Sequence, residues 1–177
     1  MTHPSTRQPS HPLSHPLSLE LGAPIVCPEE MVIEDWIDYN GHLNMAYYNV
    51  IFDHGVDYVY DFLGIGESYA QSGIGSCFTM EVHVSYLQEL SLGDGLEVRF
   101  QLLDYDHKRV HFFEQLLHKK EGYIAATSEQ IGMHVDMQSR RSAPFPEEVL
   151  AKLEDLKQAH ADLAIPPQVG HVIGIPK

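Results

Sequence analysis

Four polar residues that can do chemistry lie in one short stretch of the chain: Asp38, Asn40, His42 and Asn44. They form a predicted turn, and the residues after Asn44 have helical periodicity, so the turn ends at a helix N-terminus. That end of a helix carries unpaired N–H groups and a partial positive charge. It can therefore polarise a carbonyl oxygen, as an oxyanion hole does. The upstream carboxylate of Asp38 can attack the polarised carbon, or activate a water molecule to do so.

The same turn has a second interpretation. An Asp-rich helix cap can stabilise a turn without any catalytic role, and Asn44 is a good N-cap candidate. His42 either orients the loop, touches a substrate or only hydrogen-bonds to the backbone. Gly41 allows the sharp bend that either interpretation needs. From these residues alone, catalysis and simple capping both remain open.

Residues 45–63 predict the long helix that positions this turn. One face of the helix is apolar, as expected for packing against a sheet. Its members are Tyr48, Phe52, Gly55, Val59 and Phe62. Gly55 lowers helix propensity in mid-helix, which indicates close packing against a neighbour.

Strands are predicted on both sides of this helix. A short strand over residues 31–36 precedes the turn, and strands over 78–86, 96–102, 110–116 and 123–135 follow the helix. Short polar turns join the last four, so we expect an antiparallel four-stranded meander. One long helix on such a sheet is an α+β fold. The uncovered face or edge of the sheet favours a homodimer.

The chain of 177 residues divides into three predicted parts. Residues 1–22 are rich in Ser, Pro and His and predict a disordered leader. Residues 23–146 form one domain. Residues 147–177 form a terminal region with an amphipathic helix, predicted over 146–160, and a loose tail.

Composition excludes several classes of partner. The net charge of −14 argues against nucleic acids and anionic membranes, which need basic patches. With no signal-like segment and no membrane-length apolar run, we expect a cytoplasmic protein that does not bind membranes. The two cysteines, Cys27 and Cys77, lack metal-type spacing, and no His pair shares a predicted face. We therefore expect no metal.

The stretch Asp38–Tyr48, with the sequence DYNGHLNMAYY, resembles the site loop and helix start of hot-dog fold acyl-CoA thioesterases of the 4-hydroxybenzoyl-CoA thioesterase type. The order of elements is also similar over residues 28–146. The resemblance implies a long central helix wrapped by an antiparallel sheet, in a homodimer or homotetramer. It implies hydrolysis of an acyl-CoA to a carboxylate and CoA, with no cofactor because CoA is part of the substrate.

The same resemblance assigns roles to the turn. It makes Asp38 the catalytic residue and implies that the backbone N–H near Met45 polarises the thioester carbonyl. Many members carry a second Asp two residues before the catalytic one, where this chain has Trp36. His42 and Asn44 complete the predicted catalytic group.

Within this family the chain is most similar to the betainyl-CoA thioesterases of carnitine breakdown. The matching stretches are 35–42, 81–83, 108–112, 126–130 and 134–136. A betainyl group carries a trimethylammonium cation, which would explain a buried Glu81 beside His83 at a dimer interface. On a solvated face, both would be ordinary surface residues. Three aromatic residues, Trp36, Tyr47 and Tyr48, either add cation–π contacts or pack in the core.

Four basic residues are expected to bind the CoA phosphates. They are Lys108, Arg109, Arg140 and Arg141. Ordinary surface charge is the alternative for each of them.

Other functions remain open at this point. The fold also serves as a non-catalytic acyl-CoA-binding module, although the Asp at position 38 speaks against that role. Hot-dog dehydratases usually rely on a His-led site and lack this pattern. Short or medium fatty acyl and aromatic acyl groups are alternative substrates.

Overall fold

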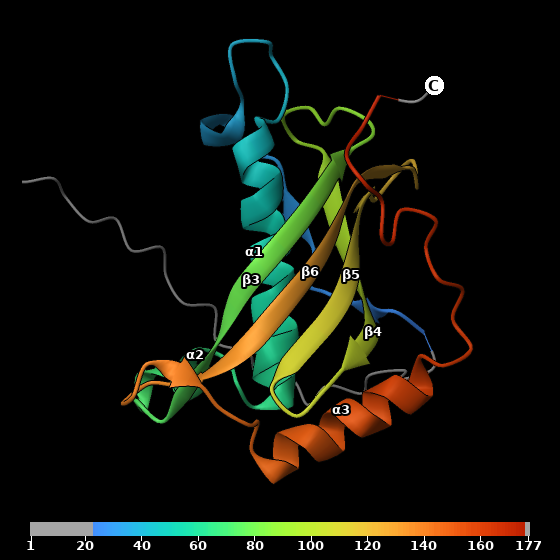
Figure 1. The fold of residues 1–177 in the computed structure, drawn as a ribbon. Helices are drawn as coiled ribbons and strands as arrows, with labels where there is room; N and C mark the ends of the chain where they lie inside the picture. The colour runs from blue at the N-terminus through green and yellow to red at the C-terminus, as the bar shows by residue number, and fades with distance from the viewer. Residues whose placement is uncertain (1–22, 176–177) are drawn as a thin grey trace, which may run out of the picture.

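The structure is a computed structural model that describes residues 23–175. The predicted leader, residues 1–22, lies outside the described residues. A long helix, α1 (Met45–Leu63), lies against one face of an antiparallel sheet, and α3 (Glu147–Ala159) crosses one end of that sheet (Figure 1). This arrangement confirms the α+β architecture and the central helix expected of a hot-dog fold. The division of the chain into leader, domain and loose tail remains a prediction.

Helix α1 has the bounds that its periodicity predicted. Asn44 is the N-cap, because its side-chain oxygen accepts a hydrogen bond from Ala46 N at 2.9 Å. Gly64 ends the helix in the left-handed conformation, with φ of 89°. Four of the five predicted core residues are buried, and Phe62 packs against the core while partly exposed.

Gly55 brings α1 close to the sheet, as predicted. A Cβ atom here would lie 2.7 Å from Glu114 Oε1 and 2.8 Å from Val98 Cγ1. Ordinary van der Waals contact between such atoms needs 3.4 Å or more. The sheet and the helix can therefore approach this closely only at a glycine.

The sheet contains four long strands and three short ones. The long strands are β3 (Gly75–Tyr86), β4 (Gly95–Tyr105), β5 (Arg109–His118) and β6 (Ile124–Asp136). The short strands β1 (Ile25–Val26) and β2 (Glu30–Met31) pair with β4, and β7 (Arg141–Ser142) pairs with β6. The main spatial order is β1-β4-β5-β6-β3, and every pairing is antiparallel.

The predicted meander is wrong in one respect, since β3 pairs with β6 and not with β4. Residues 87–94 between β3 and β4 are too many for a tight hairpin, and they cross the end of the sheet instead. Leu87 N donates to Ala125 O at 2.9 Å, and Leu43 N donates to Leu90 O at 2.7 Å. The crossing therefore places this connection beside the start of α1.

The strand predicted over residues 31–36 is also wrong. Strand β2 ends at Met31, and Glu34–Trp36 form the 3₁₀ helix η1. Two successive i→i+3 backbone hydrogen bonds of 3.1 Å close this turn. The chain must reverse here to reach α1, and a continued strand would carry it away.

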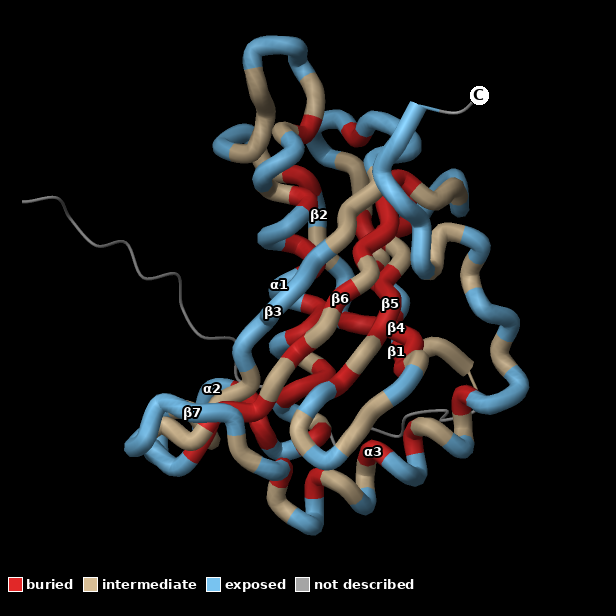
Figure 2. Tube along the Cα trace, in the orientation of Figure 1, coloured by how far each residue is buried: buried red, intermediate tan, exposed pale blue. Residues whose placement is uncertain are grey.

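Burial follows the layered architecture, with buried positions concentrated between α1 and the sheet (Figure 2). The predicted terminal helix is confirmed as α3, which buries Val149, Leu153 and Leu156. The short helix α2 (Glu67–Gln71) connects α1 to β3. Over residues 23–175, none of the helices is both long and apolar enough to cross a membrane.

Candidate active site

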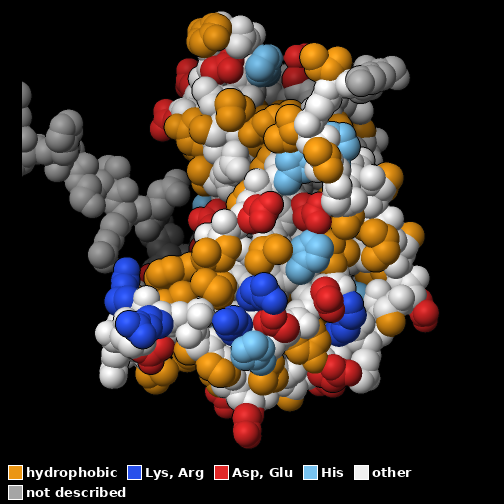
Figure 3. All heavy atoms as spheres, in the orientation of Figure 1, with side chains coloured by type: hydrophobic (Ala, Val, Ile, Leu, Met, Phe, Trp, Pro, Cys, Tyr) orange, Lys and Arg blue, Asp and Glu red, His pale blue; other side chains and the backbone are white. Residues whose placement is uncertain are grey.

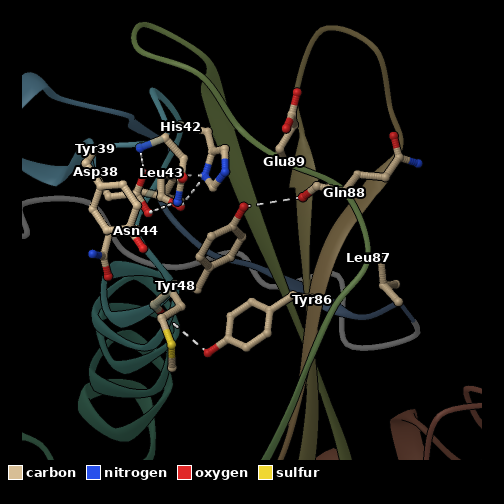
Figure 4. A pocket seen from close by; sticks show the side chains of 12 residues that line it. Asp38, Tyr39, His42, Leu43, Asn44, Tyr48, Tyr86, Leu87, Gln88 and Glu89 are labelled. Atoms are coloured by element: carbon tan, nitrogen blue, oxygen red, sulfur yellow. Dashed lines mark hydrogen bonds and ion pairs between the residues drawn. The ribbon is translucent and has the colours of Figure 1, made fainter.

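A pocket of about 590 Å³ opens at the N-terminal end of α1. Its walls are the turn that contains Asp38, the first turn of α1 and the segment that follows β3 (Figure 4). The structure thus brings all four predicted catalytic residues into one pocket. The lining residues are Asp38, Tyr39, Asn40, His42, Leu43, Asn44, Met45, Tyr48, Tyr86, Leu87, Gln88 and Glu89.

The turn that holds Asp38 is closed by its own hydrogen bonds. Asp38 N donates to His42 O at 3.0 Å, and Gly41 N donates to Asp38 O at 3.0 Å. Asp38 Oδ1 accepts from Asn40 N at 2.7 Å, which fixes the carboxylate relative to the backbone. Gly41 has φ of 86°, a conformation that favours glycine. The carboxylate is therefore held in place, with only 13% of the side chain exposed.

The start of α1 offers a free hydrogen-bond donor in this pocket. The Asn44 side chain accepts a hydrogen bond from Ala46 N, and Tyr47 N donates to Asn44 O at 3.0 Å. Among the described residues, no acceptor takes the backbone N–H of Met45. This N–H, at the positive end of a 19-residue helix, can donate to a ligand oxygen.

His42 lies beside the Asp38 carboxylate and not in direct contact with it. Its Nδ1 is 4.0 Å from Asp38 Oδ1 and 3.3 Å from Leu43 O. The ring is about one third exposed. This position fits both the loop-orienting role and the substrate-contacting role that the sequence left open.

Two tyrosines form the inner wall of the pocket. The rings of Tyr48 and Tyr86 meet edge to face, with centroids 5.2 Å apart. Tyr48 donates to Gln88 O at 3.3 Å, and Tyr86 donates to Met45 O at 3.3 Å. Burial raises the pKa of Tyr48 to about 12, so its hydroxyl keeps its proton. The two hydrogen bonds tie the start of α1 to the segment after β3.

Sequence reasoning missed the wall formed by Tyr86, Leu87, Gln88 and Glu89. Nothing in their local pattern marks them as site residues, because they belong to the end of a strand and the loop that follows. They reach Asp38 only because this loop crosses the sheet end beside α1.

Trp36 and Tyr47 lie next to the pocket without lining it. Their rings stack with centroids 5.6 Å apart and an interplanar angle of 20°, and both pack against the core. Of the three predicted cation-binding aromatics, only Tyr48 lines the pocket. The other two fit the packing alternative.

Glu81 and His83 lie on the face of the sheet that points away from α1. On β3 the side chains in step with Tyr86 face α1, and Glu81 and His83 alternate with them. This geometry separates them from Asp38 within one chain, and their role as substrate-binding residues at a dimer interface remains a prediction. They line a second pocket of about 340 Å³ together with His111, Glu129, Gln130, Ile131, Gly170, His171 and Val172.

The tail after α3 covers this second pocket. Gly170 N donates to Glu129 Oε2 at 2.7 Å, and the ring of His171 stacks on that of His83 at 5.5 Å. His111 Nε2 lies 2.8 Å from Glu129 Oε1. In the part of the chain that the structure describes, no group of three or more His, Cys, Asp or Glu side chains could hold a metal ion.

The four predicted CoA-binding residues lie at the far end of the sheet. In the strand register, Arg141 of β7 lies opposite Asp136 of β6, and Asp136 lies opposite Gly75 at the start of β3. The pocket lies at the other end of β3, roughly 36 Å away along the strand. Figure 3 shows Lys and Arg side chains on the lower half of this face, away from the helix start.

Two of these basic residues already have partners. Arg109 forms a salt bridge of 2.6 Å with Asp106, and Arg140 lies over the ring of Phe78 at 5.6 Å. Within one chain, the basic residues therefore do not reach the pocket that holds Asp38.

Comparison with known proteins relates this geometry to a family. The family model described as "Thioesterase-like superfamily" matches residues 32–153, which include the whole pocket. A Pseudomonas aeruginosa protein named betainyl-CoA thioesterase is 41% identical over 148 residues, covering 84% of this chain and 93% of that protein.

A fused protein and a solved structure show further similarity. The Rhizobium meliloti protein named L-carnitine dehydrogenase/betainyl-CoA thioesterase is 36% identical over 89% of this chain. That protein is longer, and the match covers only 32% of it. A Staphylococcus aureus structure in complex with CoA superimposes with a TM-score of 0.80 at 33% identity. That match covers 87% of this chain and 98% of the other.

Proposed function

This chain belongs to the thioesterase-like superfamily, and we propose that it hydrolyses betainyl-CoA to betaine and CoA. The observation that carries the proposal is the pocket lined by both Asp38 and Met45, whose N–H at the start of α1 has no acceptor among the described residues. A thioester needs both a group that stabilises its developing oxyanion and a group that supplies or activates a nucleophile.

In the proposed reaction, the thioester oxygen accepts a hydrogen bond from Met45 N–H, and the helix dipole stabilises the charge that develops on it. The oxygen of the water becomes one of the two oxygens of the carboxylate product. The C–S bond breaks, and the CoA sulfur takes a proton and leaves as the thiol. Asp38 either removes a proton from the attacking water or attacks the carbonyl carbon first, forming an anhydride that water then hydrolyses. No cofactor is needed for either route.

The acyl group and the location are proposed on separate grounds. Two relatives that align with most of this chain carry betainyl-CoA thioesterase in their names. Cys27 and Cys77 are both unpaired thiols, as a reducing compartment favours, so we place the reaction in the cytoplasm.

A panel of three substrates tests the proposed reaction. Betainyl-CoA, hexanoyl-CoA and a hydroxybenzoyl-CoA are each incubated with the protein, and the free thiol is measured with a thiol-reactive dye. We expect betainyl-CoA to have the highest kcat/KM. Release of thiol from none of the three would instead support a non-catalytic acyl-CoA-binding module. A preference for hexanoyl-CoA or hydroxybenzoyl-CoA would retain the thioesterase and reject the betainyl assignment.

We further propose that the active form contains a homodimer built across strand β3. This strand is 12 residues long, stands at the edge of the sheet and carries exposed apolar side chains. A long, unpaired apolar edge readily pairs with another strand. Antiparallel pairing of two β3 strands brings the start of one strand toward the end of the other. The basic residues of one copy would then approach the Asp38 pocket of the second copy and could bind the CoA phosphates there.

Substitution of Met80 by Lys on this edge is expected to weaken the dimer. Met80 is 56% exposed, and a buried lysine charge opposes edge-to-edge pairing. Met31→Lys is the matched control, since Met31 is also 56% exposed but lies on β2 at the other side of the sheet. Sedimentation velocity should show a dimer or larger assembly for the wild type and the control, and monomer for Met80→Lys. A monomeric wild type, or an unchanged Met80→Lys assembly, would contradict this interface.

A further inference from the structure

The charged lining of the active-site pocket is entirely acidic apart from His42. Its carboxylates are those of Asp38 and Glu89, and among the described residues no Lys or Arg lines it. Glu89 lies across the pocket from Asp38 and His42, with Tyr48 between the two walls (Figure 4). Such a lining disfavours an anionic acyl group and favours a cationic one.

The backbone that carries Glu89 is held from three directions. Leu87 N and Gln88 N both donate to Ala125 O, at 2.9 and 3.0 Å. Tyr123 donates its hydroxyl to Glu89 O at 3.1 Å. Tyr48, on α1, donates its hydroxyl hydrogen bond to Gln88 O. The position of Glu89 is therefore set by both the sheet and the helix, although its side chain is exposed.

The side-chain carboxylate of Glu89 is not used in these bonds. Only the backbone carbonyl of Glu89 accepts a hydrogen bond, and no side chain or N–H of the described chain pairs with the carboxylate. Such a group at the rim of a pocket can pair with a ligand cation without first losing a protein partner.

Of the two neighbouring tyrosines, Tyr86 is 44% exposed and offers its ring to a ligand, whereas Tyr48 lines the pocket but is only 4% exposed. Tyr48 and Tyr86 both donate their hydroxyls to backbone carbonyls, and Tyr86 also accepts from Asn49 Nδ2 at 3.3 Å. Their edge-to-face contact makes an aromatic corner below Glu89. Aromatic faces attract a quaternary ammonium, which cannot donate a conventional hydrogen bond.

We propose that Glu89, together with the ring of Tyr86, binds the quaternary ammonium of the acyl group and selects cationic over neutral acyl-CoAs. This inference rests on the proposed thioesterase function. A betainyl nitrogen is separated from the thioester carbon by one methylene, so its site must lie in the pocket that holds Asp38. Glu89 meets that requirement, and Glu81, on the opposite face of the sheet, does not.

Two acyl-CoAs of the same shape isolate the charge. Betainyl-CoA carries a trimethylammonium group, and 3,3-dimethylbutanoyl-CoA replaces its nitrogen by carbon. For Glu89→Gln, we expect the ratio of kcat/KM for the cationic to the neutral substrate to fall about tenfold. Glu148→Gln, an exposed glutamate in the first turn of α3 at the far end of the molecule, should leave this ratio unchanged.

The aromatic corner is tested by two substitutions at Tyr86. Tyr86→Phe keeps the ring and should keep most of the selectivity, whereas Tyr86→Leu should lower the same ratio several-fold. An unchanged ratio in Glu89→Gln would overturn the proposal, as would an equal loss on both substrates. Failure of the proposed function is a different result, since wild-type protein would then release thiol from neither substrate.

Discussion

Replacing Asp38 by Asn is expected to lower kcat for acyl-CoA hydrolysis on the order of 10³-fold. An amide can neither remove a proton from water nor attack the thioester carbon as a carboxylate does. Asparagine keeps the oxygen that accepts the 2.7 Å hydrogen bond from Asn40 N, so the turn should retain its shape. Thiol release from betainyl-CoA, measured under saturating substrate, gives kcat directly.

Asp35→Asn provides the matched control for this substitution. Asp35 is an exposed acid in η1, three residues before Asp38, and it does not line the pocket. We expect its kcat to equal that of the wild type. Full hydrolysis by Asp38→Asn would mean that the carboxylate serves only as a turn cap, the alternative that the sequence left open.

The two chemical roles of Asp38 predict different labelling patterns. In a single turnover with excess enzyme in ¹⁸O-water, direct attack by water places label in the product carboxylate and none in Asp38. Attack by Asp38 forms an anhydride, and its hydrolysis can leave label in the Asp38 side chain. Mass spectrometry of the peptide that contains residue 38 detects this label, which only the anhydride route leaves there.

A second large effect is expected at Glu114, a buried carboxyl between α1 and the sheet. Its side chain is fully buried, and Oε2 accepts a hydrogen bond from Gln130 Nε2 at 2.9 Å. Oε1 has no partner among the described residues and faces Gly55 of α1. Burial raises the pKa of Glu114 well above its usual value of 4.5, and the charge of Asp53 adds to the shift.

The raised pKa makes stability depend on pH in a defined direction. Below pH 4.5 both the folded and the unfolded chain hold the Glu114 proton. As the pH rises above this value, the unfolded chain releases the proton while the folded chain retains it. The contribution of Glu114 to stability therefore falls as the pH rises from 4.5 toward the raised pKa, by up to about 1.4 kcal/mol per pH unit.

Glu114→Gln should remove this contribution. Glutamine keeps a carbonyl oxygen for Gln130 and does not ionise, so the variant should lose less stability than the wild type between about pH 5 and pH 8. Urea unfolding at the two pH values measures the difference for each protein. Glu148→Gln, at an exposed position, should follow the wild type. Equal pH dependence in wild type and Glu114→Gln would mean that Glu114 ionises over the same pH range in the folded and the unfolded protein.

Several features of the site were predictable because they depend on short stretches of chain. The bounds of α1 follow from its apolar periodicity, and its cap follows from the Asn44 side chain. The Asp38 turn closes through hydrogen bonds that span only a few residues. Local hydrogen bonds and helical periodicity leave their pattern in consecutive residues, so these predictions were confirmed.

The structure also shows a change of face within β3 that the alternating sequence conceals. A bulge between Thr79 and Glu81 adds one residue to the strand. Phe78 pairs with Met133 and so shares the outer face with His83, which pairs with Glu129. The apolar residues Phe78 and Tyr86 therefore lie on opposite faces of β3, although apolar and polar residues alternate strictly between them. The sequence does not reveal this bulge, because apolar and polar residues continue to alternate on both sides of it.

The sequence by itself determined the acid, the turn and the helix end that lie at the centre of the proposed chemistry. Only the tertiary structure decided what faces them. The segment from Tyr86 to Glu89 reaches Asp38 because residues 87–94 cross the sheet end to place β3 beside β6. The same strand turns Glu81 and His83 to the opposite face. The order of the strands in the sheet, and the face toward which each side chain points, arise from contacts between residues far apart in the chain. Such contacts do not appear in the spacing of neighbouring residues.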